Sequence, residues 1–141
     1  MKFIVCSREE IEEGIVVRTP YIVISISDSD SKPAKLIKGC GFHEAIYVQF
    51  DDTDPKYSFG KRPMTLKQGK RIWDFVQSHQ NQVGTIVIHC LAGMSRSPAI
   101  ALALSEKLEI ESSYWRQTFN CNEHVYQTMT QAITQCDTPE A

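Results

Sequence analysis

The chain has 141 residues, of which 42% are hydrophobic and 23% are charged. This length and composition fit one ordinary globular domain and exclude a fibrous or intrinsically disordered chain. The 15 basic and 17 acidic side chains give a formal net charge of −2, so the chain lacks the basic excess that proteins binding nucleic acid through surface charge usually have.

The cysteines and the apolar segments indicate a cytoplasmic protein. There are five cysteines at irregular spacings, and this odd number does not predict a disulfide framework, so at least one thiol stays free. The N-terminal segment turns acidic after a few apolar residues, unlike a secretory signal or a transit peptide. The longest apolar stretches fall far short of the roughly 18 residues that a membrane helix needs. We therefore expect neither a membrane nor a nucleic acid among the partners.

The first third of the chain predicts a strand, a helix and two further strands. Residues 2–7 are short, apolar and β-branched, which predicts a strand. Ser7 and Glu10 have the spacing of a capping box and predict a short helix over 8–15. Two more segments rich in Ile and Val predict strands, namely 21–28 and 44–50.

A long loop follows the third predicted strand. The segment from residue 51 to Pro63 contains Pro, Gly and Ser residues typical of a surface loop, and long loops in compact domains are often lids or binding loops. Tyr57 and Phe59 on this loop either stack on a substrate ring or pin the loop to the body, and the sequence favours neither role. An acidic cluster opens the loop: Asp51, Asp52 and Asp54.

The rest of the chain predicts helices around one more strand. Thr65 and Gln68 form a capping-box pattern, and apolar residues at spacings of three and four predict an amphipathic helix to about Gln80. Residues 83–89 are apolar enough for a central strand. Three further helices are predicted: 97–108, 111–119 and 122–135. The alternation predicts an α/β fold, a single domain over residues 1–141 with a mostly parallel central sheet of four to five strands flanked by helices.

The segment after the last predicted strand has the features of an anion site. Cys90 stands at the carboxyl end of this apolar strand, and Arg96 follows six positions later, just before a helix. Such a pair arises easily by chance, so the prediction depends on its context, with Gly93 between the two and Ser97 and Pro98 after them. Ligands of open α/β sheets bind at the carboxyl ends of strands, and a helix N-terminus there offers unpaired N–H groups.

The residue types in this loop suit attack on a phosphate ester. A helix N-terminus and a nearby cation favour the reactive thiolate of a cysteine such as Cys90. Gly93 permits a backbone turn that lets the N–H groups of residues 91–96 surround an oxyanion. The planar guanidinium of Arg96 can bind two phosphate oxygens at once and stabilise the charge at phosphorus.

Residues 89–97, HCLAGMSRS, resemble the H-C-x-x-G-x-x-R-[ST] signature of the cysteine-dependent protein tyrosine phosphatase superfamily, most of all its small dual-specificity branch. The resemblance implies hydrolysis of a phosphate monoester through a phosphocysteine on Cys90, with no metal and no cofactor. It implies that Arg96 clamps the phosphate, that Ser97 hydrogen-bonds the cysteine sulfur and helps it leave, and that His89 tunes the thiolate. It also implies backbone contacts to the phosphate from Leu91, Ala92, Gly93, Met94 and Ser95.

Two residues near the motif also suit plain structural roles. His89 lies on a predicted central strand, where a histidine is often a hydrogen-bonded core residue. Asn122 precedes Glu123 and is first an N-cap of the last helix. Small phosphatases of the family often have an asparagine near this place that braces the surroundings of the active site.

The reaction also needs a proton donor for the leaving oxygen and then a base for water, and one carboxyl group can serve both steps. The family places an aspartate on the loop after the strand that precedes the signature's own helix–strand unit. Asp51, Asp52 and Asp54 are at that place in this chain. We expect Asp52 to be the general acid, although its spacing to Cys90 is somewhat longer than is usual in the branch, so Asp51 and Asp54 stay open as alternatives.

Two other classes of function remain alternatives. A rhodanese-like sulfurtransferase or an arsenate reductase also uses a cysteine in an anion-binding loop, but needs neither the upstream aspartate nor Ser97. A catalytically silent phosphate-binding module usually lacks the equivalent of Cys90 or Arg96, and both are present. The loop has none of the extra lysines of polyphosphorylated inositide or RNA-end phosphatases. This favours a phosphorylated protein over another phosphate monoester as substrate.

Overall fold

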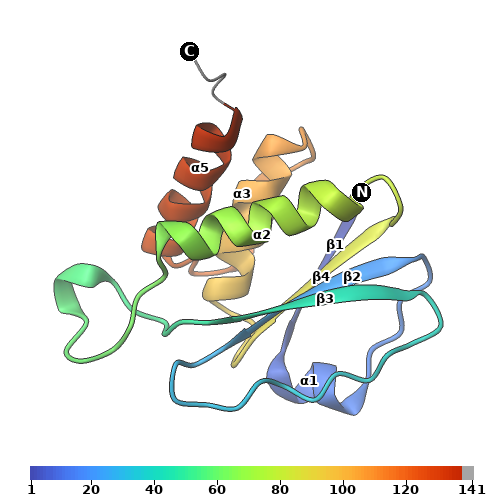
Figure 1. Ribbon diagram of the computed structural model, residues 1–141, viewed down its shortest axis with the longest axis horizontal. Coiled ribbons are helices and arrows are strands. Elements are labelled where there is room, and N and C mark those ends of the chain that lie inside the picture. The colour runs from blue at the N-terminus through green and yellow to red at the C-terminus, as the bar shows by residue number, and fades with distance from the viewer. Residues whose placement is uncertain (138–141) are drawn as a thin grey trace.

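A parallel sheet runs through the middle of the molecule (Figure 1). The structure is a computed structural model, and it describes residues 1–137. Across those residues the sheet has four strands in the order β1–β4–β2–β3, and every neighbouring pair is parallel. The strands are β1 (Lys2–Ser7), β2 (Tyr21–Ser27), β3 (Phe42–Gln49) and β4 (Thr85–Cys90). The predicted α/β fold with a mostly parallel sheet is confirmed.

Helices cover both faces of this sheet. In Figure 1, α2, α3 and α5 lie on one face and α1 lies on the other. The helices are α1 (Arg8–Glu13), α2 (Leu66–His79), α3 (Arg96–Lys107), α4 (Ser113–Thr118) and α5 (Glu123–Asp137). All predicted strands and helices are present, and their ends differ from the prediction by at most two residues. Among the helices described, none is long and apolar enough to cross a membrane.

Local sequence sets where α1 and α2 begin. The Ser7 hydroxyl accepts a hydrogen bond from the Glu10 backbone N–H, and the Glu10 carboxylate accepts one from the Ser7 backbone N–H, at 3.1 and 2.9 Å. Thr65 and Gln68 make the same reciprocal pair at the start of α2. Both predicted capping boxes are therefore confirmed. A short 3₁₀ helix, η1 (Pro55–Tyr57), lies in the segment predicted as a plain loop.

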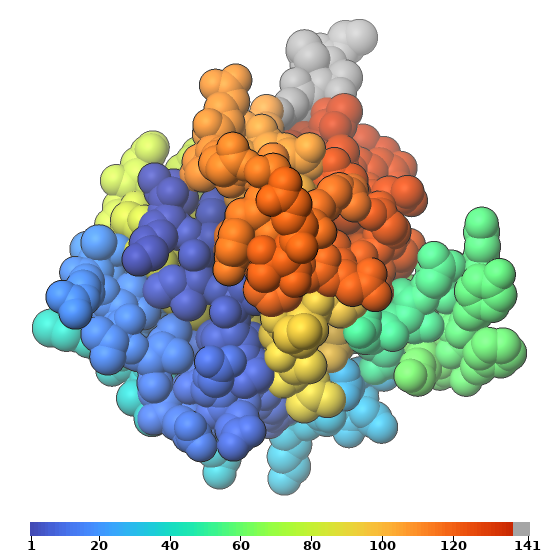
Figure 2. Space-filling view, turned by 180° about the vertical axis from the view of Figure 1, so that it is seen from behind, coloured from blue at the N-terminus to red at the C-terminus, as the bar shows by residue number. Residues whose placement is uncertain are grey.

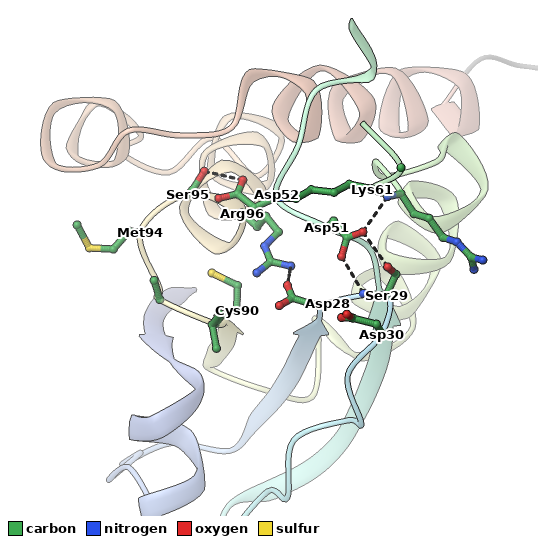
Figure 3. A pocket seen from close by; sticks show the side chains of 14 residues that line it. Asp28, Ser29, Asp30, Asp51, Asp52, Lys61, Cys90, Met94, Ser95 and Arg96 are labelled. Atoms are coloured by element: carbon green, nitrogen blue, oxygen red, sulfur yellow. Dashed lines mark hydrogen bonds and ion pairs between the residues drawn. The ribbon is translucent and has the colours of Figure 1, made fainter. Parts of the chain in front are cut away.

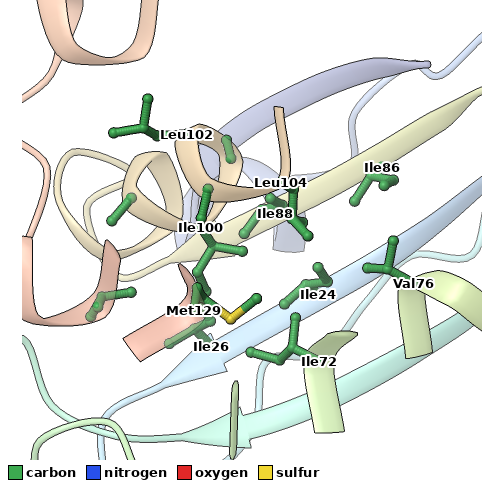
Figure 4. Close-up of a cluster of buried hydrophobic side chains, with 14 of the residues drawn as sticks. Ile24, Ile26, Ile72, Val76, Ile86, Ile88, Ile100, Leu102, Leu104 and Met129 are labelled. Atoms are coloured by element: carbon green, nitrogen blue, oxygen red, sulfur yellow. The ribbon is translucent and has the colours of Figure 1, made fainter. Parts of the chain in front are cut away.

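The core is divided into two layers by the sheet. Side chains alternate along a strand, so β2 and β4 send one set of residues to each face. Val23 and Val87 pack on the α1 side. The larger layer lies under α2, α3 and α5 (Figure 4), and its fully buried strand residues are Ile22, Ile24, Ile26, Ile86 and Ile88. Because both faces are covered, the two central strands are buried throughout, and β4 carries Cys90 to the edge of the sheet.

Candidate active site

The carboxyl ends of three strands and the N-terminus of α3 meet at one edge of the sheet (Figure 3). Cys90 ends β4 and Arg96 begins α3. Asp28 follows β2, whereas Asp51 and Asp52 come soon after β3. All five residues line one cavity with a volume of about 660 Å³. Open α/β sheets bind their ligands at this kind of edge.

The loop between β4 and α3 surrounds the sulfur of Cys90. The backbone N–H of Gly93 donates a hydrogen bond to Sγ over 3.3 Å, and the Ser97 hydroxyl lies 3.1 Å from the same sulfur. The sequence placed Cys90, Gly93 and Ser97 in one motif, and the structure brings their polar atoms together. Leu91 and Met94 stand on the outer side of the loop, with more than half of each side chain exposed.

Gly93 has no tolerable substitute in this conformation. Its φ is +70°, a left-handed value that side chains other than glycine rarely adopt. A Cβ atom at this position would lie 2.6 Å from the carbonyl carbon of Cys6 and 2.9 Å from the backbone nitrogen of Ser7. The loop therefore packs directly on the end of β1. The turn was predicted from the sequence, but this close approach to β1 was not.

The guanidinium of Arg96 is buried, with only 3% of the residue exposed. Its Nη1 donates to the Phe50 carbonyl over 2.7 Å and forms an ion pair with Asp28 over 2.8 Å (Figure 3). Its Nε is buried and has no hydrogen-bond partner within residues 1–137. A buried donor without a partner costs about 1–3 kcal/mol. An oxyanion in the cavity would satisfy it.

Asp28 was missed by the sequence analysis. Its partner, Arg96, lies far along the chain, so no local pattern joins the two. The available signal was position, because Asp28 directly follows a buried strand at the edge where Cys90 also lies.

The three aspartates after β3 have different surroundings, and Asp51 is the buried one. The backbone N–H groups of Arg62 and Ser29 donate to its carboxylate over 2.7 and 2.9 Å, and the Ser29 hydroxyl donates over 2.7 Å. Burial alone would raise the pKa of Asp51, but these hydrogen bonds lower it below its usual range. Asp51 therefore stays ionised and ties the loops after β2 and β3 together.

Asp52 contacts the loop of Cys90, whereas Asp54 does not. One carboxylate oxygen of Asp52 accepts from the Ser95 hydroxyl over 3.0 Å and from the Asn122 side-chain amide over 2.8 Å. The Asp54 carboxylate accepts from the Lys56 backbone N–H over 2.8 Å and caps η1. Of the three aspartates, the geometry favours Asp52 for exchange of a proton at the cavity.

Asn122 links the start of α5 to this side of the cavity. Its side-chain oxygen accepts from the Val125 backbone N–H over 3.1 Å, which is the N-cap bond expected from the sequence. Its backbone N–H donates to the Ser95 carbonyl over 3.1 Å, and its side-chain amide donates to Asp52. The residue therefore caps the helix and holds the aspartate at once.

His89 lies behind the loop and is fully buried. Its Nε2 lies 2.6 Å from the Ser25 hydroxyl on β2, and its Nδ1 lies 3.3 Å from the Cys90 carbonyl. Burial lowers the pKa of His89, so its imidazole is neutral at neutral pH. The His89 side chain therefore links the backbone of Cys90 to Ser25 on the neighbouring strand, β2. A tuning effect on the thiolate stays a prediction.

The long loop after β3 lines the cavity only near its two ends, through Asp51 and Asp52 and again through Gly60, Lys61 and Arg62. The side chains of Tyr57 and Phe59 are 70% and 89% exposed and lie outside the lining. Figure 2 shows this segment, in green, projecting from the body of the molecule. The two aromatic rings thus neither pin the loop to the body nor line the cavity.

The five cysteines are all free thiols, as the odd count implies for at least one of them. Burial, with smaller contributions from Glu10 and Cys90, raises the pKa of Cys6 to about 12, so this neighbour of the loop is protonated at neutral pH. Within residues 1–137, no three His, Cys, Asp or Glu side chains gather as metal ligands.

Solved structures show which known fold this is. The human tyrosine phosphatase-like serine/threonine/tyrosine-interacting protein matches with a TM-score of 0.57 at 15% identity, over 83% of this chain and 78% of that one. The tyrosine phosphatase OH1 from the Orf virus matches with a TM-score of 0.42 at 16% identity, over 96% and 84% of the two chains. Neither a family model nor a curated protein matches the sequence. The first likeness establishes the fold.

Proposed function

We propose that this chain, which has a protein tyrosine phosphatase-like fold, hydrolyses phosphate monoesters through a phosphocysteine on Cys90. One observation carries the proposal. The sulfur of Cys90 faces the Gly93 N–H and the Ser97 hydroxyl, while the buried guanidinium of Arg96 leaves one donor unpaired beside the same cavity. A nucleophile next to an unfilled oxyanion site is the arrangement that transfer of a phosphoryl group requires.

The first step forms the phosphocysteine. The backbone N–H groups of residues 91–95 and the guanidinium of Arg96 bind the phosphate oxygens. The thiolate of Cys90 attacks phosphorus, so that the S–P bond forms and the bond to the ester oxygen breaks. Asp52, in its protonated form, gives its proton to the leaving oxygen, and the alcohol or phenol departs.

The second step returns the enzyme to its starting state. The Asp52 carboxylate takes a proton from water as the water oxygen attacks phosphorus. The S–P bond breaks, and the Ser97 hydroxyl donates a hydrogen bond to the departing sulfur. Inorganic phosphate leaves, and the proton is again on Asp52. Each step uses only groups that this chain supplies.

We infer that the substrate is a phosphorylated protein, with phosphotyrosine and phosphoserine or phosphothreonine both open to it. The loop residues 91–95 include no lysine, so the loop and the start of α3 offer the bound phosphate backbone N–H groups and a single arginine. The exposed apolar side chains of Leu91 and Met94 at the cavity rim suit a protein surface.

Hydrolysis of p-nitrophenyl phosphate at mildly acidic pH, with EDTA present, tests the proposal. We expect turnover by the wild-type chain and none by Cys90→Ser. The matched control is Cys40→Ser, which removes an exposed thiol away from the cavity and should leave the rate unchanged. A folded wild-type chain that binds phosphate without turnover would instead favour a silent phosphate-binding module. Turnover of thiosulfate or arsenate in its place would favour the sulfurtransferase or arsenate reductase class.

A further inference from the structure

A second cavity adjoins the first on the side of β3. It has a volume of about 370 Å³ and shares Ser29 and Arg62 with the active-site cavity. The remaining lining comes from Tyr47 on β3, from the loop after β2, and from the start of α2 up to Arg71. We call it the Arg62–Arg71 cavity. Because the two cavities have a common boundary, a single extended ligand can occupy both.

The charge of this part of the chain is one-sided. Residues 56–71 contain no acidic side chain and six basic ones, which are Lys56, Lys61, Arg62, Lys67, Lys70 and Arg71. Two of the six, Arg62 and Arg71, line the second cavity. The local field therefore favours an anion.

The guanidinium groups of Arg62 and Arg71 have no carboxylate and no hydrogen-bond acceptor among the residues that the structure describes. Of the other exposed or partly exposed arginines, Arg8 pairs with Glu12 and Arg116 pairs with Glu123, whereas Arg18 stands alone on the surface among the described residues and lines neither cavity. A planar guanidinium binds carboxylates and phosphates through two parallel hydrogen bonds. Two free ones in a single cavity leave several donors available to an oxyanion.

Apart from Tyr47, the neutral polar side chains of the cavity are already hydrogen-bonded. The Thr65 hydroxyl accepts from the Gln68 backbone N–H, and the Gln68 side-chain amide donates to the Gln49 carbonyl over 2.7 Å. The Gln49 amide donates to the Ser31 carbonyl over 2.6 Å. What remains is positive charge beside the half-exposed ring of Tyr47. This lining suits an anionic group, and the boundary shared by the two cavities suits an extended peptide that reaches from one to the other.

We propose that the Arg62–Arg71 cavity is a second oxyanion subsite, which binds a phosphate or carboxylate group of another residue on the same substrate peptide. This inference rests on the proposed function. With the scissile phosphate held by the loop of Cys90, a second anionic side chain extends past Ser29 and Arg62 to reach Arg71. The subsite gives the enzyme a preference for acidic or multiply phosphorylated segments of a protein.

The test is a series of phosphotyrosine peptides with neutral flanks. A single phosphoserine or a single glutamate is placed one to four residues to either side of the phosphotyrosine, and kcat/KM is measured for each peptide. We expect the wild-type chain to prefer at least one anionic peptide by about tenfold, the effect of one charge-assisted hydrogen bond. The phosphoserine and glutamate arms show which oxyanion the subsite takes.

In Arg71→Ala, the ratio of kcat/KM for the preferred anionic peptide to kcat/KM for the neutral peptide should fall close to one. The rate on p-nitrophenyl phosphate should stay unchanged, because Arg71 lies outside the active-site cavity. Lys67→Ala is the matched control. It removes the same charge from an exposed position of the same helix, outside both cavities, and should keep the preference.

Three results overturn the inference. The first is an absence of preference in every peptide while p-nitrophenyl phosphate is hydrolysed. The second is an equal loss of preference in Lys67→Ala, which would indicate a general field instead of a site. The third is faster turnover of a soluble inositol polyphosphate than of any peptide. A wild-type chain inactive on p-nitrophenyl phosphate refutes the proposed function itself, so that failure is separate from the other three.

Discussion

Arg96 is held from behind by two oxygens, the Phe50 carbonyl and the Asp28 carboxylate. Both bonds use Nη1, so the guanidinium is fixed in place before any ligand binds, and its buried Nε stays available. Donors that are already oriented need no reorganisation when charge develops on a phosphoryl group. We therefore infer that Asp28 is a positioning residue, which would act on a substrate through Arg96.

Replacing Asp28 tests this role. We expect Asp28→Ala to lower kcat/KM on p-nitrophenyl phosphate by about 10- to 100-fold, because a charge-assisted bond that orients Arg96 is lost. Asp28→Asn keeps an acceptor and should keep most of the activity. The control is Asp30→Ala, which removes the same charge from the same cavity without a bond to Arg96. Equal losses in Asp28→Ala and Asp30→Ala would show that only the charge of the cavity matters.

The buried imidazole of His89 makes stability depend on pH. Burial lowers the pKa of His89 from its ordinary value of 6.5. Below about pH 6.5, the unfolded chain binds a proton that the folded chain does not, so the free energy of unfolding falls as the pH falls. Above that pH the imidazole is neutral in both states and the effect is absent. The slope reaches at most about 1.4 kcal/mol per pH unit.

Urea unfolding at pH 5, 6 and 7 measures this slope. We expect the wild-type chain to lose more stability between pH 7 and pH 5 than His89→Gln does, whatever the stability of the variant at pH 7. His43→Gln removes an exposed histidine and should leave the wild-type slope in place. An identical slope in the wild-type chain and His89→Gln would contradict the assignment.

At the scale of elements, the start of α5 contacts the proposed general acid and the loop of Cys90. Asn122 caps this helix and also donates to Asp52, while its backbone N–H holds Ser95. The packing of α5 on α2 and α3 therefore fixes the proposed general acid relative to the loop of Cys90.

The two roles of Asn122 can be separated. Asn122→Asp keeps a good N-cap but places a carboxylate next to Asp52, so stability should change little while activity falls. Asn122→Ala should lose both the N-cap of α5 and the hydrogen bond to Asp52. The loss of the cap alone should lower the free energy of unfolding by about 1 kcal/mol. The fall in activity should be larger on phenyl phosphate than on p-nitrophenyl phosphate, because the poorer leaving group depends more on the proton from Asp52. Equal losses on the two esters would show that Asn122 does not act through Asp52.

Local features of the sequence predicted the elements well. Both capping boxes need only residues three apart, and the apolar runs of β2 and β4 follow from burial on two faces. The nucleophile motif was predicted for a similar reason, since Cys90, Gly93 and Ser97 lie within one short loop. The 3₁₀ helix η1 was missed because it depends on the short-range cap by Asp54 in a segment with no apolar periodicity.

Features that depend on strand order were not predictable. The ion pair between Asp28 and Arg96 requires β2 to lie beside β4, and the contact of Gly93 with Cys6 requires β1 on the other side of β4. No spacing along the chain encodes that order. The choice among the three aspartates was open for the same reason, because only the fold shows that Asp52 meets Ser95 and Asn122.

At the scale of the whole molecule, a bound oxyanion should hold several elements together. It would bridge the loop after β4 and Arg96 on α3, which itself is tied to the ends of β2 and β3. We expect inorganic phosphate at about 100 times its Kd to stabilise the fold by about 2.7 kcal/mol, a rise in Tm on the order of 10 °C. Sodium chloride at equal ionic strength should not do this, nor should phosphate with Arg96→Ala. A rise that persists in Arg96→Ala would place the anion elsewhere.

The position of β4 between β1 and β2 has a consequence for the growing chain on the ribosome. Both flanking strands are made early, yet they do not pair with each other, and the gap between them is filled only by Thr85–Cys90. Until that segment emerges, β1 has no neighbour in the sheet. The strand that joins the two halves also carries Cys90, so a nascent chain completes its sheet and places its proposed nucleophile in the same event.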